Sequence, residues 1–215
     1  MHPHVPSIPH SVLFQAPGRP LAASRLRAAQ ERVARQVIDA TAEFGLHVAG
    51  ETADTSRMRW RGDAVAPAQL GDLLEVVLDR AAGCLDADLI GGANVTRLDR
   101  SITCAHARLP YRKALRIANG RGWSLALGED IPEGAQATLV RFCGLLPVQV
   151  PFLPGQPRPV SFGGAAHGLV YILPLAGEAI RAEVGAGSGR TTCDLDLGRL
   201  LQFCLGLAET PRDLV

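Results

Sequence analysis

Cys104 and His106 are two residues apart, and their types suit nucleophilic catalysis. A strand over residues 103–107 would place both side chains on the same face. A reactive thiolate needs a base or a cation to lower its pKa, and His106 together with Arg108 could supply both. In the alternative interpretation, Cys104 is a small buried hydrophobe and His106 is an ordinary surface histidine. We favour this alternative because no acidic residue that would orient the imidazole is identifiable.

A second candidate is a local excess of positive charge. Between positions 97 and 121 the chain carries seven basic residues and one acid, which gives this stretch a net charge of +6. Guanidinium groups bind phosphate and carboxylate oxygens, and neighbouring aromatic rings offer a flat surface for a base. The alternative is a solvated strand edge, where positive charge prevents pairing with another sheet. The candidate ligand-binding residues are Arg108, Arg112, Lys113, Arg116, Tyr111 and Trp123.

Metal ligands are sparse and scattered. His2, His4 and His10 lie in a proline-rich segment, where any metal would be held weakly. Asp194 and Asp196 alternate with apolar residues, which is typical of the solvent-facing side of a strand. The glycine-rich segment 185–192 lacks the glycine spacing and the lysine of a phosphate-binding loop. We therefore predict neither an intrinsic metal nor a cofactor.

The whole-chain charge narrows the range of partners. The 215 residues include 22 Lys and Arg against 21 Asp and Glu, a formal net charge of +1. A near-neutral total disfavours nucleic acid as a partner. No apolar stretch is long enough to span a bilayer, and the N-terminus does not resemble an export signal. Five cysteines without close CxxC pairs indicate reduced thiols, so we expect a cytoplasmic protein.

The chain divides into an extended proline-rich arm over residues 1–20 and a single domain over residues 21–215. Apolar residues recur at helical spacing from Leu26 to Phe44, and Gly45 stands where a helix C-cap glycine belongs. Residues 57–61 alternate strictly, which predicts a strand with its arginines facing solvent. A second helix is predicted to begin near Pro67.

From about residue 91 to 197, nearly every segment reads as strand. Asn119-Gly120 suits a tight turn, so residues 114–118 and 123–127 are predicted to form a hairpin. Further strands are expected at 138–143, 148–152, 169–173, 179–184 and 191–197, followed by a helix at 198–208. This order predicts an α+β fold, with a mostly antiparallel β-sheet packed by two N-terminal helices and one C-terminal helix.

Two functional hypotheses follow. The favoured one is a cytoplasmic binding or accessory protein of the α+β class, with a homodimer as one candidate assembly. Its basic stretch would face an anionic small molecule or an acidic protein surface. The alternative is a transferase or hydrolase that acts on an anionic substrate, with Cys104 as nucleophile and His106 as base. The sequence does not decide whether the protein is an enzyme.

Overall fold

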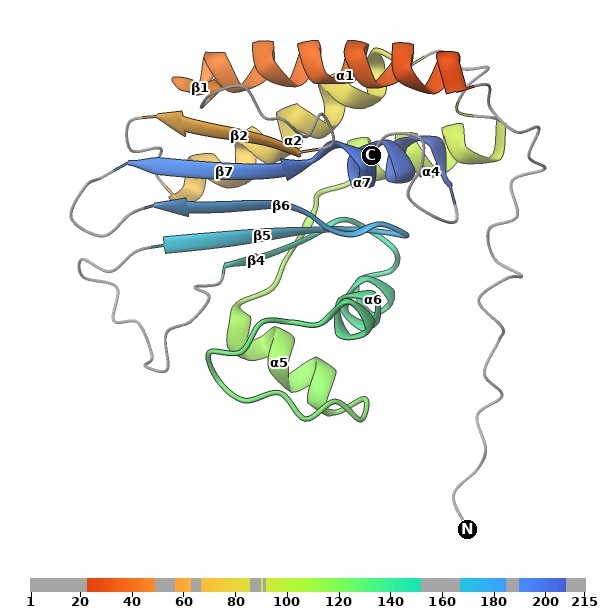
Figure 1. Ribbon diagram of the computed structural model, residues 1–215. Coiled ribbons are helices and arrows are strands. Elements are labelled where there is room, and N and C mark those ends of the chain that lie inside the picture. Colours follow the sequence, from red (N-terminus) through yellow and green to blue (C-terminus); the bar gives the residue numbers. More distant parts are fainter. Residues whose placement is uncertain are drawn as a thin grey trace.

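A computed structural model describes residues 23–48, 57–62, 67–85, 90, 92–151, 167–184 and 190–207 (Figure 1). The predicted N-terminal arm, with His2, His4 and His10, lies outside the described residues. No helix in the described part of the chain is long and apolar enough to cross a membrane.

Both predicted N-terminal helices are present. Helix α1 (Ala23–Glu43) buries Leu26, Ala29 and Val33 along one face, as the helical spacing of these residues requires. It is followed by Gly45 at a φ of +72°, the left-handed conformation that glycine adopts at low cost. Helix α2 (Pro67–Gly83) begins at its proline and packs against α1.

The described strands form one seven-stranded sheet, in the order β1-β2-β7-β6-β5-β4-β3. Strands β3 and β4 are parallel, and the other neighbouring pairs are antiparallel, so the sheet is mixed. The α+β class is confirmed. The strands are β1 (Leu46–Val48), β2 (Arg57–Gly62), β3 (Ala107–Arg108), β4 (Val148–Pro151), β5 (His167–Leu173), β6 (Gly177–Val184) and β7 (Thr191–Asp196).

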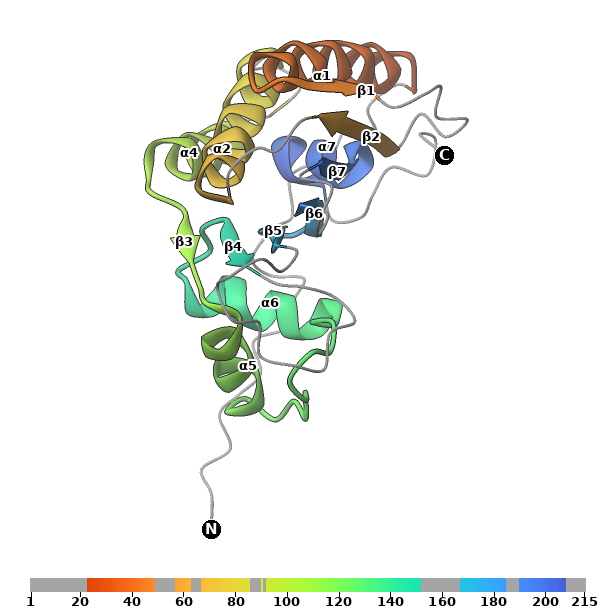
Figure 2. The ribbon, with the colours of Figure 1, turned by 90° about the vertical axis from the view of Figure 1, so that its left-hand side faces the viewer.

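Strand β5 shows how the helices cover the two faces of the sheet. Its residues Leu169, Tyr171 and Leu173 belong to a core shared with α1 and α2, whereas Val170 and Ile172 belong to a second core on the opposite face. A strand that is buried on both faces reads as a continuous apolar run, as the segment 169–173 does. The second core is built with α5 (Tyr111–Asn119) and α6 (Glu133–Phe142), which lie at the far end of the molecule from α1 (Figure 2).

The predicted hairpin over 114–118 and 123–127 is wrong, because residues 111–119 form helix α5. The buried residues Ala114, Leu115 and Ala118 have the spacing of one helix face. Asn119 ends the helix, and its side chain pairs with the backbone of Leu125 in both directions at 2.9 Å. The Asn-Gly pair therefore marks a helix C-terminus and not a hairpin turn.

The predicted strand over residues 138–143 is also wrong, and so is the strand over residues 103–107 that the Cys104–His106 hypothesis requires. Residues 138–143 fall largely in α6, whose buried positions Ala135, Leu139 and Val140 have helical spacing. Helix α4 (Gly92–Thr103) ends within the segment 103–107, of which β3 takes only the last residue. The C-terminal helix is present as α7 (Leu197–Leu205).

Candidate functional site

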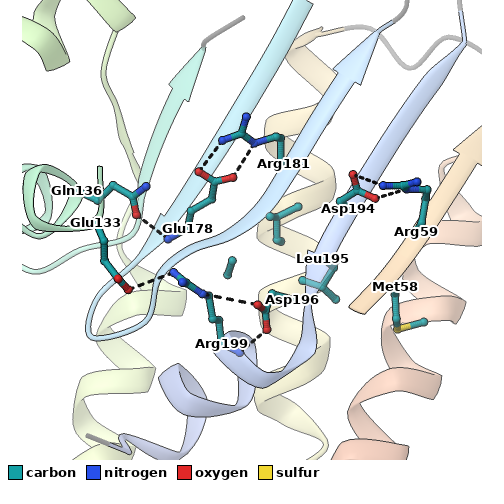
Figure 3. Close-up of a pocket in the computed structure, with 12 residues that line it drawn as sticks. Met58, Arg59, Glu133, Gln136, Glu178, Arg181, Asp194, Leu195, Asp196 and Arg199 are labelled. Atoms are coloured by element: carbon teal, nitrogen blue, oxygen red, sulfur yellow. Dashed lines mark hydrogen bonds and ion pairs between the residues drawn. The ribbon is translucent and has the colours of Figure 1, made fainter. Parts of the chain in front are cut away.

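A charged pocket of about 520 Å³ lies on the face of the sheet that α6 covers only in part (Figure 3). Its floor consists of strands β2, β7 and β6, and its walls come from α6 and the first turn of α7. Ligand pockets commonly span roughly 300–1,000 Å³, so this one could hold a small molecule. The polar lining residues are Arg59, Glu133, Gln136, Glu178, Arg181, Asp194, Asp196 and Arg199.

A cross-strand row of charges forms the floor. Arg59 on β2 stands opposite Asp194 on β7, which stands opposite Arg181 on β6. The Arg59 guanidinium donates through Nε to Asp194 Oδ1 at 2.5 Å and through Nη2 to Oδ2 at 3.2 Å. This hydrogen bond raises the pKa of Arg59 above its usual value. The preceding and following residues on β2, Met58 and Trp60, point into the core, as the alternation predicted.

Arg181 is held by two carboxylates. Its Nε and Nη2 donate to Glu178 at 2.7 and 3.0 Å, and its Nη1 and Nη2 donate to Asp130 at 3.3 and 3.2 Å. The hydrogen bond to Glu178 is the main reason that the pKa of Arg181 is raised. Buried Gln136 joins α6 to this strand, because its Oε1 accepts from the backbone N–H of Glu178 at 2.8 Å.

Arg199 closes the pocket at the start of α7. The side chain of Asp196 caps this helix by accepting from the Arg199 backbone N–H at 2.9 Å. The Arg199 guanidinium donates to the Ala176 carbonyl at 2.9 Å and lies 3.4 Å from Glu133 and 3.6 Å from Asp196. Gly177 has a φ of +74°, and a Cβ there would lie 2.8 Å from Arg199 Nη1. A larger residue here would strain the backbone and displace the end of the Arg199 side chain.

The pocket thus brings three guanidinium groups together with four carboxylates, those of Glu133, Glu178, Asp194 and Asp196. A simple anion would meet these carboxylates and be repelled. A ligand with both a positive and a negative group can pair with each sign, by taking the place of one partner in the existing ion pairs. Among the described residues, no group of three or more His, Cys, Asp or Glu side chains could hold a metal ion.

Cys104 and His106 do not form a catalytic pair. Cys104 follows the last residue of α4, so the two side chains do not share a strand face. Both ring nitrogens of buried His106 are engaged elsewhere. Nε2 lies 2.8 Å from the Ser101 carbonyl, and Nδ1 lies 2.6 Å from the Tyr171 hydroxyl. The imidazole therefore has no free nitrogen to accept a proton from Cys104.

The predicted ligand-binding residues lie away from the pocket and separate into three groups. Arg108 is ion-paired with Asp72 at 3.4 Å and Glu75 at 3.5 Å. The rings of Tyr111 and Trp123 hold the segment between α5 and α6. The Tyr111 hydroxyl donates to the Glu129 carbonyl at 2.5 Å, and Trp123 Nε1 donates to Thr138 at 3.4 Å. The third group is Arg112, Lys113 and Arg116, which are exposed on α5.

The pocket was not predicted from the sequence, although two of its signals were visible there. The arginines of residues 57–61 and the aspartates of residues 191–197 were both predicted to face solvent. What was missing is the strand order, because Arg59 and Asp194 are 135 positions apart and meet only when β7 lies beside β2. Arg181 and Arg199 had no distinguishing spacing.

The fold is shared with aminoacyl-tRNA synthetases for asparagine and aspartate. One similar structure is asparaginyl-tRNA synthetase from Pyrococcus horikoshii, with 12% identity and a TM-score of 0.67 over 92% of this chain and 67% of that chain. The same enzyme complexed with asparaginyl-adenylate gives a TM-score of 0.64 at 12% identity, over 90% of this chain and 68% of that chain. Asparaginyl-tRNA synthetase from Entamoeba histolytica gives a TM-score of 0.53 at 14% identity, over 86% of this chain and 54% of that chain.

At these identities the similarity establishes the fold alone. The chain spans about two thirds of the Pyrococcus chains and about half of the Entamoeba chain. No protein-family model and no curated protein sequence matches it.

These structural neighbours correct three predictions. The prediction of an accessory protein that binds an anionic small molecule or an acidic surface is wrong. The alternative prediction, a transferase or hydrolase with Cys104 and His106 as catalytic residues, is also wrong. The prediction that nucleic acid is an unlikely partner is also wrong, because each of these similar structures is a tRNA synthetase. The physical reason is that a net charge of +1 is an average over the chain and says nothing about separate surfaces with local charge.

Proposed function

We propose that the charged pocket binds an aminoacyl adenylate and that the protein activates an amino acid with ATP. The observation that carries the proposal is the pairing of three guanidinium groups with four carboxylates on the open sheet face. An aminoacyl adenylate carries an ammonium group and a phosphate anion, so it needs partners of both signs. The fold supports the same ligand class, since one similar structure is complexed with asparaginyl-adenylate.

In the proposed reaction, a carboxylate oxygen of the amino acid attacks the α-phosphorus of ATP. A new phosphorus–oxygen bond forms, the bond to the oxygen that bridges the α- and β-phosphorus breaks, and pyrophosphate leaves with the electron pair. Charge develops on the phosphate oxygens in the transition state, and positioned guanidinium groups stabilise it. Arg199 and Arg181 are the less exposed arginines of the pocket, and we assign this role to them.

The carboxylates have a complementary role. Glu178 and Asp196 are the most shielded acids of the pocket, with about a fifth of each side chain exposed. We assign the substrate ammonium group to this pair, because a shielded carboxylate binds a cation more strongly than an exposed one. ATP and amino acids are both cytoplasmic metabolites, which is consistent with the compartment we expect.

The proposal is tested with non-hydrolysable aminoacyl-sulfamoyl adenosines, one for each standard amino acid. A bound analogue at about 100 times its Kd adds roughly 2.7 kcal/mol of stability. For a chain of this size, that is a rise in Tm of about 5–10 °C. The matching amino acid should also support exchange of labelled pyrophosphate into ATP.

The matched variants are Arg199→Gln in the pocket and Arg80→Gln on α2, whose ion pair with Glu43 lies outside it. We expect Arg199→Gln to abolish the shift in Tm and Arg80→Gln to leave it unchanged. A Tm that responds to none of the analogues would overturn the proposal, and so would an equal shift in both variants.

A further inference from the structure

We propose that the exposed face of helix α5 is a binding surface for the phosphate backbone of an RNA. This surface, named here the α5 basic face, consists of Arg112, Lys113 and Arg116. None of the three lines the charged pocket, so the assignment does not depend on the ligand of that pocket.

Helical geometry gathers these charges on one side. Positions 112 and 116 are one turn apart and position 113 lies beside them, while Ala114, Leu115 and Ala118 face the core. Side chains one helical turn apart are about 5–6 Å from each other at Cβ. Helix α5 contains no acidic residue. The result is a continuous cationic strip on a single helix.

These cations are unpaired within the described part of the chain. No carboxylate there lies within ion-pairing distance of Arg112, Lys113 or Arg116, whereas all three arginines of the pocket and Arg108 have carboxylate partners. Helix α1 offers the contrast, because its exposed Arg27 and Arg35 alternate with Glu31 on one face. As far as the described residues go, the exposed α5 basic face is therefore available to an external anion.

The position of the charges along α5 is unfavourable for the helix itself. Arg112 and Lys113 stand in the first turn, where the helix dipole presents its positive end and where acidic residues are stabilising. Pro110 at the N-cap makes no side-chain hydrogen bond to the helix. Cations at a helix N-terminus reduce stability by a few tenths of a kcal/mol each, so folding does not explain their presence there. Binding of an anionic partner does.

The chemistry around Lys113 favours RNA over an acidic protein. Helix α5, which carries Lys113, packs against α6, whose C-cap is Cys143, and the charge of Lys113 lowers the pKa of the Cys143 thiol against the larger raising effect of burial. Phe142, next to Cys143, is 53% exposed, more than any other large apolar side chain in the described residues. An exposed ring near a cation can stack on an unpaired base while the cation contacts phosphate.

The test measures binding of a short hairpin RNA by fluorescence anisotropy across a salt series. Each phosphate contact contributes about 0.7–0.9 to the slope of log K against log salt. We expect Arg112→Gln/Lys113→Gln/Arg116→Gln to weaken binding and to flatten the slope by about 2–3. The control, Arg25→Gln/Arg27→Gln/Arg35→Gln, removes three exposed cations from α1 and should keep the slope of the unchanged protein.

Additional measurements distinguish RNA binding from a loss of folding and from binding of an acidic protein. The α5 triple variant should be at least as stable as the unchanged protein and should keep any response to adenylate analogues. If the triple variant does not fold, the three single variants replace it. Each should reduce the slope of log K against log salt by about 1. Poly-glutamate should compete poorly, and Phe142→Ala should weaken binding to the hairpin loop. Equal losses in the α1 and α5 variants, or equal competition by poly-glutamate, would overturn the proposal.

Discussion

The Tyr171 hydroxyl lies 2.6 Å from Nδ1 of His106, and both side chains are buried. Burial raises the pKa of Tyr171, and the charges of Glu75 and Cys204 raise it further, so the hydroxyl keeps its proton. Tyr171 is therefore the donor and Nδ1 the acceptor. The other ring nitrogen, Nε2, donates to the Ser101 carbonyl at 2.8 Å. In the neutral imidazole, this arrangement places the proton on Nε2.

The first prediction concerns Tyr171→Phe. The change leaves Nδ1 of His106 buried without a donor, because its other polar neighbour, Glu75 at 3.7 Å, is an acceptor. An unsatisfied buried acceptor costs about 1–3 kcal/mol. We expect the free energy of unfolding in urea to fall by that amount, and Tm to fall by about 2–4 °C for each kcal/mol.

Tyr111→Phe is the matched control. The Tyr111 hydroxyl bonds to the backbone at Glu129 and Gly128, but at a partly exposed site where water can replace it. Tyr111→Phe should therefore lower the free energy of unfolding clearly less than Tyr171→Phe does. Equal losses would mean that the buried bond to His106 contributes no more than an exposed one.

The second prediction concerns Gly177→Ala. The φ of +74° at this position strains any L-residue, at a cost of about 1–2 kcal/mol, and the new methyl group meets Arg199 Nη1 at 2.8 Å. Displacing the guanidinium breaks its hydrogen bond to the Ala176 carbonyl. We expect an additional loss of about 1 kcal/mol in the free energy of unfolding.

Gly45→Ala separates backbone strain from the clash. Gly45 has a φ of +72°, and a Cβ there would meet nothing within 4 Å. A double-mutant cycle then isolates the contribution of Arg199: because Gln136 Oε1 also lies 3.1 Å from the new Cβ, the excess cost of Gly177→Ala over Gly45→Ala should shrink in an Arg199→Ala background without vanishing. Additive effects of the two changes would show that the methyl group does not disturb the guanidinium.

The third prediction concerns the reactivity of Cys143. Burial raises the pKa of its thiol, and Lys113 partly opposes this by stabilising the thiolate. Lys113→Gln removes the cation, so the pKa of Cys143 rises further and the thiolate fraction at mildly alkaline pH falls. We expect iodoacetamide to alkylate Cys143 more slowly, with a pH–rate profile displaced to higher pH. Mass spectrometry of the labelled peptide measures the rate.

Arg121→Gln serves as the comparison, because it removes the same charge from the same region and Arg121 is not among the groups that shift the pKa of Cys143. Cys193 gives an internal reference. Its thiol is fully buried and its pKa is strongly raised, so it should stay unlabelled in every folded variant. A Cys143 profile that is identical with and without Lys113 would contradict the prediction and remove one support for the α5 basic face.

Local patterns predicted the elements whose periodicity allows one interpretation only. Helix α1 buries Ala29, Val33 and Val37, all at helical spacing, and ends before Gly45 as expected. Strand β2 alternates Met58 and Trp60 with exposed arginines. The predicted strand over residues 114–118 was wrong because small residues such as Ala114 and Ala118 fit a helix face and a strand equally well. The Asn-Gly pair then favoured the wrong alternative.

The sequence alone determined which side chains of β2 and β7 face water, because period and polarity are local properties of the chain. Alternation by itself placed Arg59 and Asp194 on the solvent-facing sides of two strands. Only the tertiary structure decided that these strands are neighbours and that α6 and α7 bring Glu133 and Arg199 to the same face. Strand order depends on packing across two separate cores, between residues more than a hundred positions apart, and no local pattern encodes it.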